Sequence, residues 1–217
     1  MAKLLTIDVV SDVMCPWCWI GKRRLTKALE LVEGVPVSVR WRPYQLDPTL
    51  PPEGKDRRRY LEEKFGGPDR AAEIYARIGE AGAAEGLPMA LDAITVSPNT
   101  LDAHRLVRWA ANEGEDTQER VVEMLFEAFF AKAENIAEHD VLVRIAEDAG
   151  MQAKVVRDLL ATDADRAATL EEIAKAQAMG VQGVPCYILA DRYAVTGAQD
   201  PETLAGAIRQ VAAETVS

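Results

Sequence analysis

The chain has 217 residues, of which 48% are hydrophobic and 28% are charged, as is ordinary for a globular protein. Its formal net charge of −10 argues against binding to nucleic acid, and no apolar stretch approaches the roughly 20 residues that cross a membrane. Three cysteines are too few for a disulfide framework, and the N-terminus lacks the apolar region and cleavage site of a secretory signal. We therefore expect a cytoplasmic protein.

The first predicted strand leads directly to a pair of cysteines. Residues 4–10 form a short, β-branched apolar run that predicts a buried strand, and Cys15 and Cys18 follow at the start of an amphipathic helical pattern. Pro16 suits a first helical turn. The free N–H groups and the dipole of a helix start favour an anion, so we expect Cys15 to be held partly as thiolate. Cys18, one turn further on, is within reach to close a disulfide, which favours redox chemistry.

The residues around this pair allow other interpretations. A structural zinc site needs four ligands, and Cys186, His104 and His139 offer no second metal-binding spacing, so no metal is predicted. Two inert structural thiols are a further alternative. Lys22 is on the same predicted helix face as Cys15, where its charge would stabilise a thiolate, although a solvated lysine fits equally well. Trp17 and Trp19 are candidates for an apolar substrate surface, and Trp19 fits a core position as easily.

The remaining elements divide into two strand-containing parts and a helical block. Residues 36–41 predict a second strand, and a proline-rich loop follows. From about residue 55 to 180 the pattern is almost wholly helical, with Ser97 as a helix N-cap and Asp116 opening a capping box. The basic run 57–59, flanked by acidic residues, predicts a solvated helix face. Strand patterns return at residues 186–189 and 193–195, before a last helix over 201–213.

This order predicts an α/β fold whose two halves are separated by an all-helical insertion. The first half covers residues 1–54, the insertion 55–162 and the second half 163–217.

The sequence Gly183-Val184-Pro185-Cys186 places a proline where a sheet strand begins. Proline cannot donate to the ladder, and an X-Pro bond is the common route to a cis peptide. A cis bond would leave the backbone groups of Val184 free to pair with an extended substrate. A trans proline that merely starts the strand is the simpler interpretation of this motif alone.

Taken together, the two motifs resemble the thioredoxin superfamily, specifically DsbA-type oxidoreductases and most closely their FrnE-like branch. The matching segments run in order nearly from end to end: residues 12–22 (DVMCPWCWIGK), 99–106 (NTLDAHRL), 180–185 (GVQGVP) and 193–199 (YAVTGAQ). The resemblance implies a thioredoxin fold split by a helical insert, with Cys15 attacking, Cys18 resolving and a cis-Pro185 facing them.

The expected function is thiol–disulfide exchange on a disulfide-containing protein or a small thiol, with the substrate docked at Val184, Pro185 and Trp17. No bound cofactor is expected, and glutathione or another thiol is the expected co-substrate. In a reducing cytoplasm, reduction or isomerisation is easier to sustain than net oxidation. A homodimer is left open.

Two alternatives belong to other classes. Glutathione-dependent 2-hydroxychromene-2-carboxylate isomerases and kappa-class glutathione transferases share this architecture, but they usually carry serine at the position of Cys15. A redox sensor or chaperone-like binding protein would carry a reactive pair without turnover.

Two further residues remain to be placed. DsbA-type proteins usually have an aromatic residue at the position of Cys186, which we expect to pack as a small apolar side chain, the alternative being an approach to the cysteine pair. The resemblance places the helix of His104 over the pair, where this histidine would line the substrate cleft. A hydrogen-bonded structural histidine is the alternative.

Overall fold

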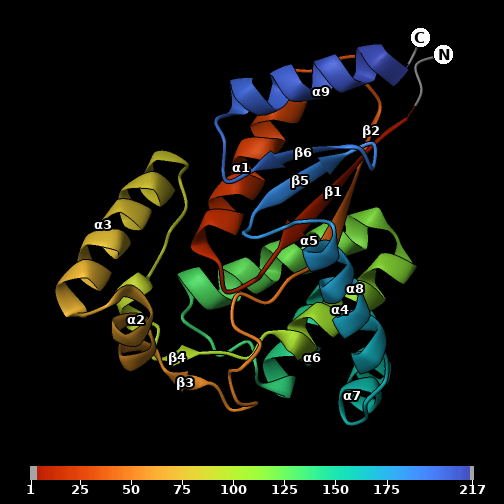
Figure 1. Cartoon of the computed structure of the whole chain (residues 1–217). Helices are drawn as coiled ribbons and strands as arrows, with labels where there is room; N and C mark the ends of the chain where they lie inside the picture. The colour runs from red at the N-terminus through yellow and green to blue at the C-terminus, as the bar shows by residue number, and fades with distance from the viewer. Residues whose placement is uncertain (1–3, 216–217) are drawn as a thin grey trace.

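A four-stranded sheet lies at the centre of the fold in the computed structural model, which describes residues 4–215 (Figure 1). Its strands are β1 (Leu5–Ser11), β2 (Val37–Pro43), β5 (Cys186–Leu189) and β6 (Tyr193–Thr196). Their order is β2-β1-β5-β6; β1 is parallel to β2 and antiparallel to β5, which is antiparallel to β6. The beginning and the end of the chain therefore form one sheet, as the sequence predicts.

The alternation of side chains along β1 and β5 gives the sheet two different faces. The terminal helices α1 (Pro16–Glu30) and α9 (Pro201–Thr215) lie side by side (Figure 1). Together they cover the face that carries the side chains of Ile7, Tyr187 and Leu189. Val10 and its register partner Cys186 point to the opposite face.

The chain between β2 and β5 is mostly helical. Its helices are α2 (Arg57–Phe65), α3 (Pro68–Ala84), α4 (Leu101–Glu113), α5 (Glu115–Phe126), α6 (His139–Asp148), α7 (Ala153–Leu160) and α8 (Arg166–Ala178), with a 3-10 turn at Leu91–Ala93 and a π-helical turn at Glu127–Ala131. Helices α4, α5 and α8 contact β2, while α3 packs against α1. Among the helices of residues 4–215, none combines the length and the apolarity needed to cross a bilayer.

Three local predictions for this block were wrong. The insertion over residues 55–162 is not all-helical, because β3 (Lys55–Asp56) and β4 (Val96–Ser97) pair as a small antiparallel sheet. Ser97 is therefore a strand residue, and α4 begins only at Leu101 with Thr100 in the N-cap position. The expected capping box at Asp116 is also absent, since α5 begins at Glu115, directly after Gly114.

Candidate active site

The two cysteines of the CxxC motif stand at the start of α1, which begins where β1 has ended. Cys15 is the N-cap residue of this helix, and its backbone is extended. Its amide donates to the Asp12 carbonyl at 2.9 Å, and the amide of Cys18 donates to the Cys15 carbonyl at 3.0 Å. Cys15 is 4% exposed and Cys18 is 1% exposed, and both are free thiols. We call these two residues the thiol pair.

The two thiols differ in the electrostatic environment that determines their protonation. Burial raises the pKa of Cys18 well above its ordinary value, and the hydrogen bond to Cys15 and the charge of Cys15 act in the same direction. The backbone of Asp12 opposes this by a smaller amount. Cys18 is therefore a protonated thiol at neutral pH. Cys15, at the helix N-terminus, occupies the position where the free N–H groups and the helix dipole favour an anion.

The Val184–Pro185 segment faces the thiol pair. Its peptide bond is cis, and the Cys15 thiol lies 3.7 Å from the carbonyl oxygen of Val184, to which it can donate. Gly21 allows this approach, because a Cβ at that position would lie 2.8 Å from Cγ of Pro185 and would also clash with the Tyr187 hydroxyl. The structure thus brings together two motifs that are 169 residues apart in the sequence.

The tryptophans beside the thiol pair lie in opposite environments. Trp17 is 37% exposed, whereas Trp19 is 1% exposed and stacks on Phe126 and Phe130 of the insertion. The indole N–H of Trp19 donates to Glu123 at 3.1 Å. Trp17 alone is available as an apolar surface, and Trp19 belongs to the core.

Lys22 is not a solvated lysine, one of the two alternatives expected for it. Its ammonium group is buried between Glu119 and Glu123 of α5, at 2.6 Å from a carboxylate oxygen of each. A lysine paired with two carboxylates is not a solvated one, and it offers little net positive charge to a thiolate at Cys15. Its contacts tie α1 to the insertion.

His104 is buried and faces Asp12. Its Nε2 lies 3.3 Å from Oδ1 of Asp12, and Oδ2 of this fully buried carboxylate accepts from the amide of Leu46 at 2.8 Å. The ring contacts the loop that precedes Cys15, which agrees with a hydrogen-bonded structural histidine, and a role of His104 in substrate binding stays a prediction. The pairing with Asp12 could not be read from two residues so distant in sequence.

Cys186 packs in a small apolar cluster, which we call the Cys186 cluster and which consists of Val10, Tyr44, Ala176, Val181 and Cys186. Cys15 and Cys18 belong to a different cluster. Burial raises the pKa of the Cys186 thiol. These contacts agree with the expected small apolar side chain in the strand.

One prediction for the insertion fails in an instructive way. Arg58 and Arg59 are solvated and pair with Glu62 and Glu63, as the basic run predicts. Arg57 is instead 3% exposed. The signal that could have identified it is helical phase, because Arg57 and the buried Tyr60 are one turn apart on the same face of α2. Among the residues described, no group of three His, Cys, Asp or Glu side chains could hold a metal ion.

Comparisons with known proteins agree with this geometry. Residues 6–209 match the DSBA-like thioredoxin domain family. The structure of a probable DsbA oxidoreductase from Streptomyces coelicolor, SCO1869, is 30% identical, with a TM-score of 0.85 over 95% of this chain and 89% of that one. The uncharacterized protein YwbO of Bacillus subtilis is 26% identical over 191 residues, which cover 85% of this chain and 86% of YwbO.

A more distant structure shares the fold. The cytosolic disulfide reductase DsbM from Pseudomonas aeruginosa, solved with GSH, is 17% identical with a TM-score of 0.61, over 97% of this chain and 96% of that one. The predicted fold class, a thioredoxin fold interrupted by a helical insertion, is confirmed.

Proposed function

The chain belongs to the DSBA-like thioredoxin domain family and is 30% identical to a probable DsbA oxidoreductase, and on this basis we propose that Cys15 and Cys18 are its reacting pair. The observation that carries the proposal is the contact of the Cys15 thiol with the Val184 carbonyl, which sets the cysteine against the backbone of the cis-proline segment. Cys18 lies one turn behind it, in the position of a resolving thiol.

The reaction follows from the different environments of the two thiols. The thiolate of Cys15 attacks one sulfur of a substrate disulfide, so that a Cys15–substrate disulfide forms and the other substrate sulfur leaves as a thiolate. Cys18 then gives up its proton and attacks the sulfur of Cys15. The Cys15–Cys18 disulfide forms, the mixed disulfide breaks, and the second substrate sulfur leaves. The same steps run backwards oxidise a dithiol.

Substrate docking is assigned to the surface around Cys15. Val184 offers backbone groups to an extended substrate, Pro185 packs beside it, and the exposed Trp17 offers an apolar contact. Glutathione is a candidate co-substrate, in keeping with the GSH in the structure of DsbM. In a reducing compartment, reduction or isomerisation is the direction that such a pair sustains.

The experiment is turnover of insulin disulfides, or of a glutathione mixed disulfide, by the purified protein. Cys15→Ala should abolish turnover, because no other thiolate faces Val184. Cys186→Ala, which removes a thiol outside the thiol pair, should leave it unchanged. Full turnover by folded Cys15→Ala would falsify the assignment.

A glutathione-dependent isomerase or transferase remains the alternative, and it makes a different prediction for the second cysteine. Conjugation or isomerisation chemistry needs no resolving thiol, so Cys18→Ala would retain that activity in full. A redox sensor or chaperone-like protein would form the Cys15–Cys18 disulfide but show no turnover with any reductant.

A further inference from the structure

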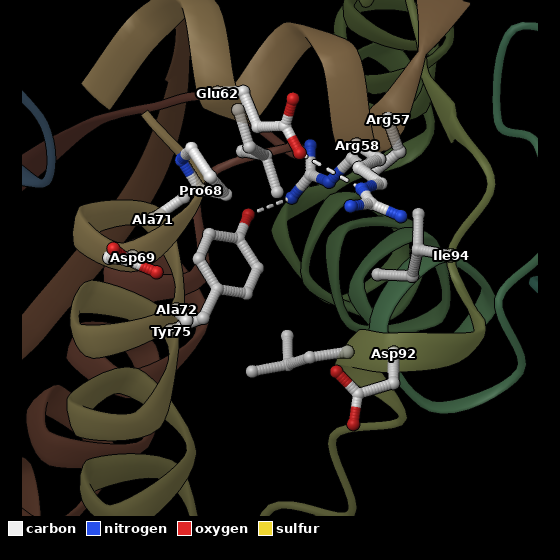
Figure 2. A pocket seen from close by; sticks show the side chains of 12 residues that line it. Arg57, Arg58, Glu62, Pro68, Asp69, Ala71, Ala72, Tyr75, Asp92 and Ile94 are labelled. Carbon is white, nitrogen blue, oxygen red and sulfur yellow. Dashed lines mark hydrogen bonds and ion pairs between the residues drawn. The ribbon is translucent and has the colours of Figure 1, made fainter. Parts of the chain in front are cut away.

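A cavity of about 470 Å³ lies between α2, α3 and the 3-10 turn at Leu91–Ala93. Figure 2 shows it from close by, with Arg57 and Tyr75 on facing walls. Its apolar surface comes from Leu61, Ala71 and Ile94 among others. This volume is in the range of small-molecule sites, which are typically mostly apolar with a few polar groups that fix the ligand.

The cavity is lined by a buried cation, the guanidinium group of Arg57. Arg57 donates to the Ser97 hydroxyl at 3.2 Å and to the Tyr75 hydroxyl, and its guanidinium lies over the rings of Tyr75 and Phe129. Its Nε–H is buried without a partner. Within residues 4–215 it forms no ion pair, and the burial lowers its pKa. A buried charge without a counter-ion is expensive, and a ligand that supplied the counter-ion would relieve that cost.

The other charged groups of the cavity do not neutralise Arg57. Arg58 bonds to Glu62 at 2.9 Å, so these two charges compensate each other. Asp69 and Asp92 are exposed, and Figure 2 shows both carboxylates turned away from the two guanidinium groups. The effect of exposed carboxylates on an incoming anion is screened by solvent and salt, whereas a buried guanidinium acts at close range.

The cavity is connected to the thiol pair through α3. This helix packs against α1, and Glu85 at its C-terminal end binds Arg24 and Lys27 of α1, at 2.7 Å each. Burial raises the pKa of Tyr75, and Arg57 lowers it by a smaller amount. Cys15 is close enough to Tyr75 for its charge to raise this pKa as well. Tyr75, which bonds to Arg57 in the wall of the cavity, therefore lies within range of the charge of Cys15.

We propose that this cavity binds a carboxylate carried by the small thiol or disulfide that reacts at Cys15, with Arg57 as the group that binds it. The inference rests on the proposed function, since it names the substrate class of the same site. The unpartnered Nε–H of the guanidinium can donate to one oxygen of that carboxylate in a charge-assisted hydrogen bond. The cavity thus selects acidic low-molecular-weight substrates for a protein whose net charge of −10 would otherwise repel them.

The test is single-turnover reduction of two matched disulfides, 3,3′-dithiodipropionate and its uncharged diamide, by the pre-reduced protein. In each reaction one substrate S–S bond breaks, the Cys15–Cys18 bond forms, and the two thiol hydrogens pass to two product thiols. The wild type should react at least about tenfold faster with the dianion, as expected for one charge-assisted contact. Arg57→Met should reduce this ratio of rate constants about tenfold.

Two further variants make the test decisive. Arg59→Met removes the same charge from the same helix, on a side chain that is exposed and outside the cavity, and it should leave both rate constants unchanged. Ala72→Trp fills the cavity from an exposed position and keeps Arg57, and it should also remove the preference, which decides the matter if Arg57→Met does not fold. Retention of the preference in folded Arg57→Met, or in Ala72→Trp, overturns the inference.

A wild type that reduces the diamide as fast as the dianion overturns the inference and leaves the proposed function intact. A wild type that reduces neither disulfide overturns the proposed function itself.

Discussion

The thiol pair and the Cys186 cluster are two cysteine environments that belong to different apolar clusters of the fold. Both are buried, and burial raises the pKa of Cys18 and of Cys186 alike. They differ in what surrounds the sulfur. Cys15 caps a helix and contacts the carbonyl of Val184, whereas Cys186 contacts apolar side chains within a strand. Burial by itself therefore does not distinguish a reactive cysteine from an inert one, but a helix N-terminus beside the sulfur does.

The two environments also differ in how they are held. Helix α1 is tied to the insertion by charged groups, through Lys22 with Glu119 and Glu123 and through Arg24 with Glu85. The Cys186 cluster is held by apolar side-chain packing and by backbone hydrogen bonds, including the pairing of Val10 with Cys186 in the sheet. The stability of the first should therefore depend on pH where carboxylates titrate, and that of the second should not.

The largest expected contrast is in the fate of a substrate disulfide. Cys18→Ala should accumulate a mixed disulfide on Cys15 and lower turnover at least about a hundredfold, because no second thiol completes the exchange. Cys186→Ala should accumulate none and retain turnover within about twofold. Mass spectrometry of acid-quenched reactions identifies the adducts. A substrate adduct on Cys186 in the Cys18→Ala protein would remove the distinction between the two environments.

The order of alkylation should separate the same thiols without any substrate. At pH 7.5, iodoacetamide should modify Cys15 at least about tenfold faster than Cys18 or Cys186, because it reacts with thiolates and the raised pKa of the latter two keeps them protonated. Labelling of Cys186 should rise only above pH 9, because 9.0 is the ordinary pKa of a cysteine thiol and burial raises the pKa of Cys186 above it. Peptide mapping after timed quenching measures all three. Equal rates for Cys15 and Cys186 at neutral pH would contradict the expected difference.

Short motifs allowed much of this architecture to be predicted. The strand before Cys15, the helix after it and the proline before Cys186 are each specified by a few adjacent residues, and they fall where the sequence places them. The opposite orientation of Cys186 also follows from local information, because alternate residues of β5 point to opposite faces. Structural features that depend on adjacent residues in the sequence were therefore predictable.

The partners of charged residues were not predictable in this way. The roles expected of Lys22, Arg57 and His104 named no partner residue, yet each is bonded to a side chain from another element. A long charged side chain can reach any of several partners, and only the packing of the insertion against α1 and β1 selects one. The surroundings of the CxxC motif therefore include residues that belong to no recognisable sequence motif.

The smallest expected effects concern stability, and they sharpen the comparison between charged and apolar anchoring. Burial alone would raise the pKa of Glu123, but the charge of Lys22 and hydrogen bonds from Lys22 and Trp19 hold it below its ordinary value of 4.5. A lowered carboxylate pKa means that the stabilisation is present above pH 4.5 and is lost as the pH falls through the folded-state pKa. Glu123→Gln should lower the free energy of unfolding by about 1 to 2 kcal/mol at pH 7, since Lys22 retains Glu119.

Urea unfolding between pH 3 and 8 measures this difference, which should shrink towards about pH 3 as the wild-type carboxylate becomes protonated. Cys186→Ala is the matched change in the apolar environment, and it should lower the free energy of unfolding by about 1 kcal/mol at every pH in that range. Its thiol does not titrate there, because burial raises a pKa that is already 9.0. A difference for Glu123→Gln that stays constant down to pH 3 would mean that packing, rather than the ion pair with Lys22, holds α1 to the insertion.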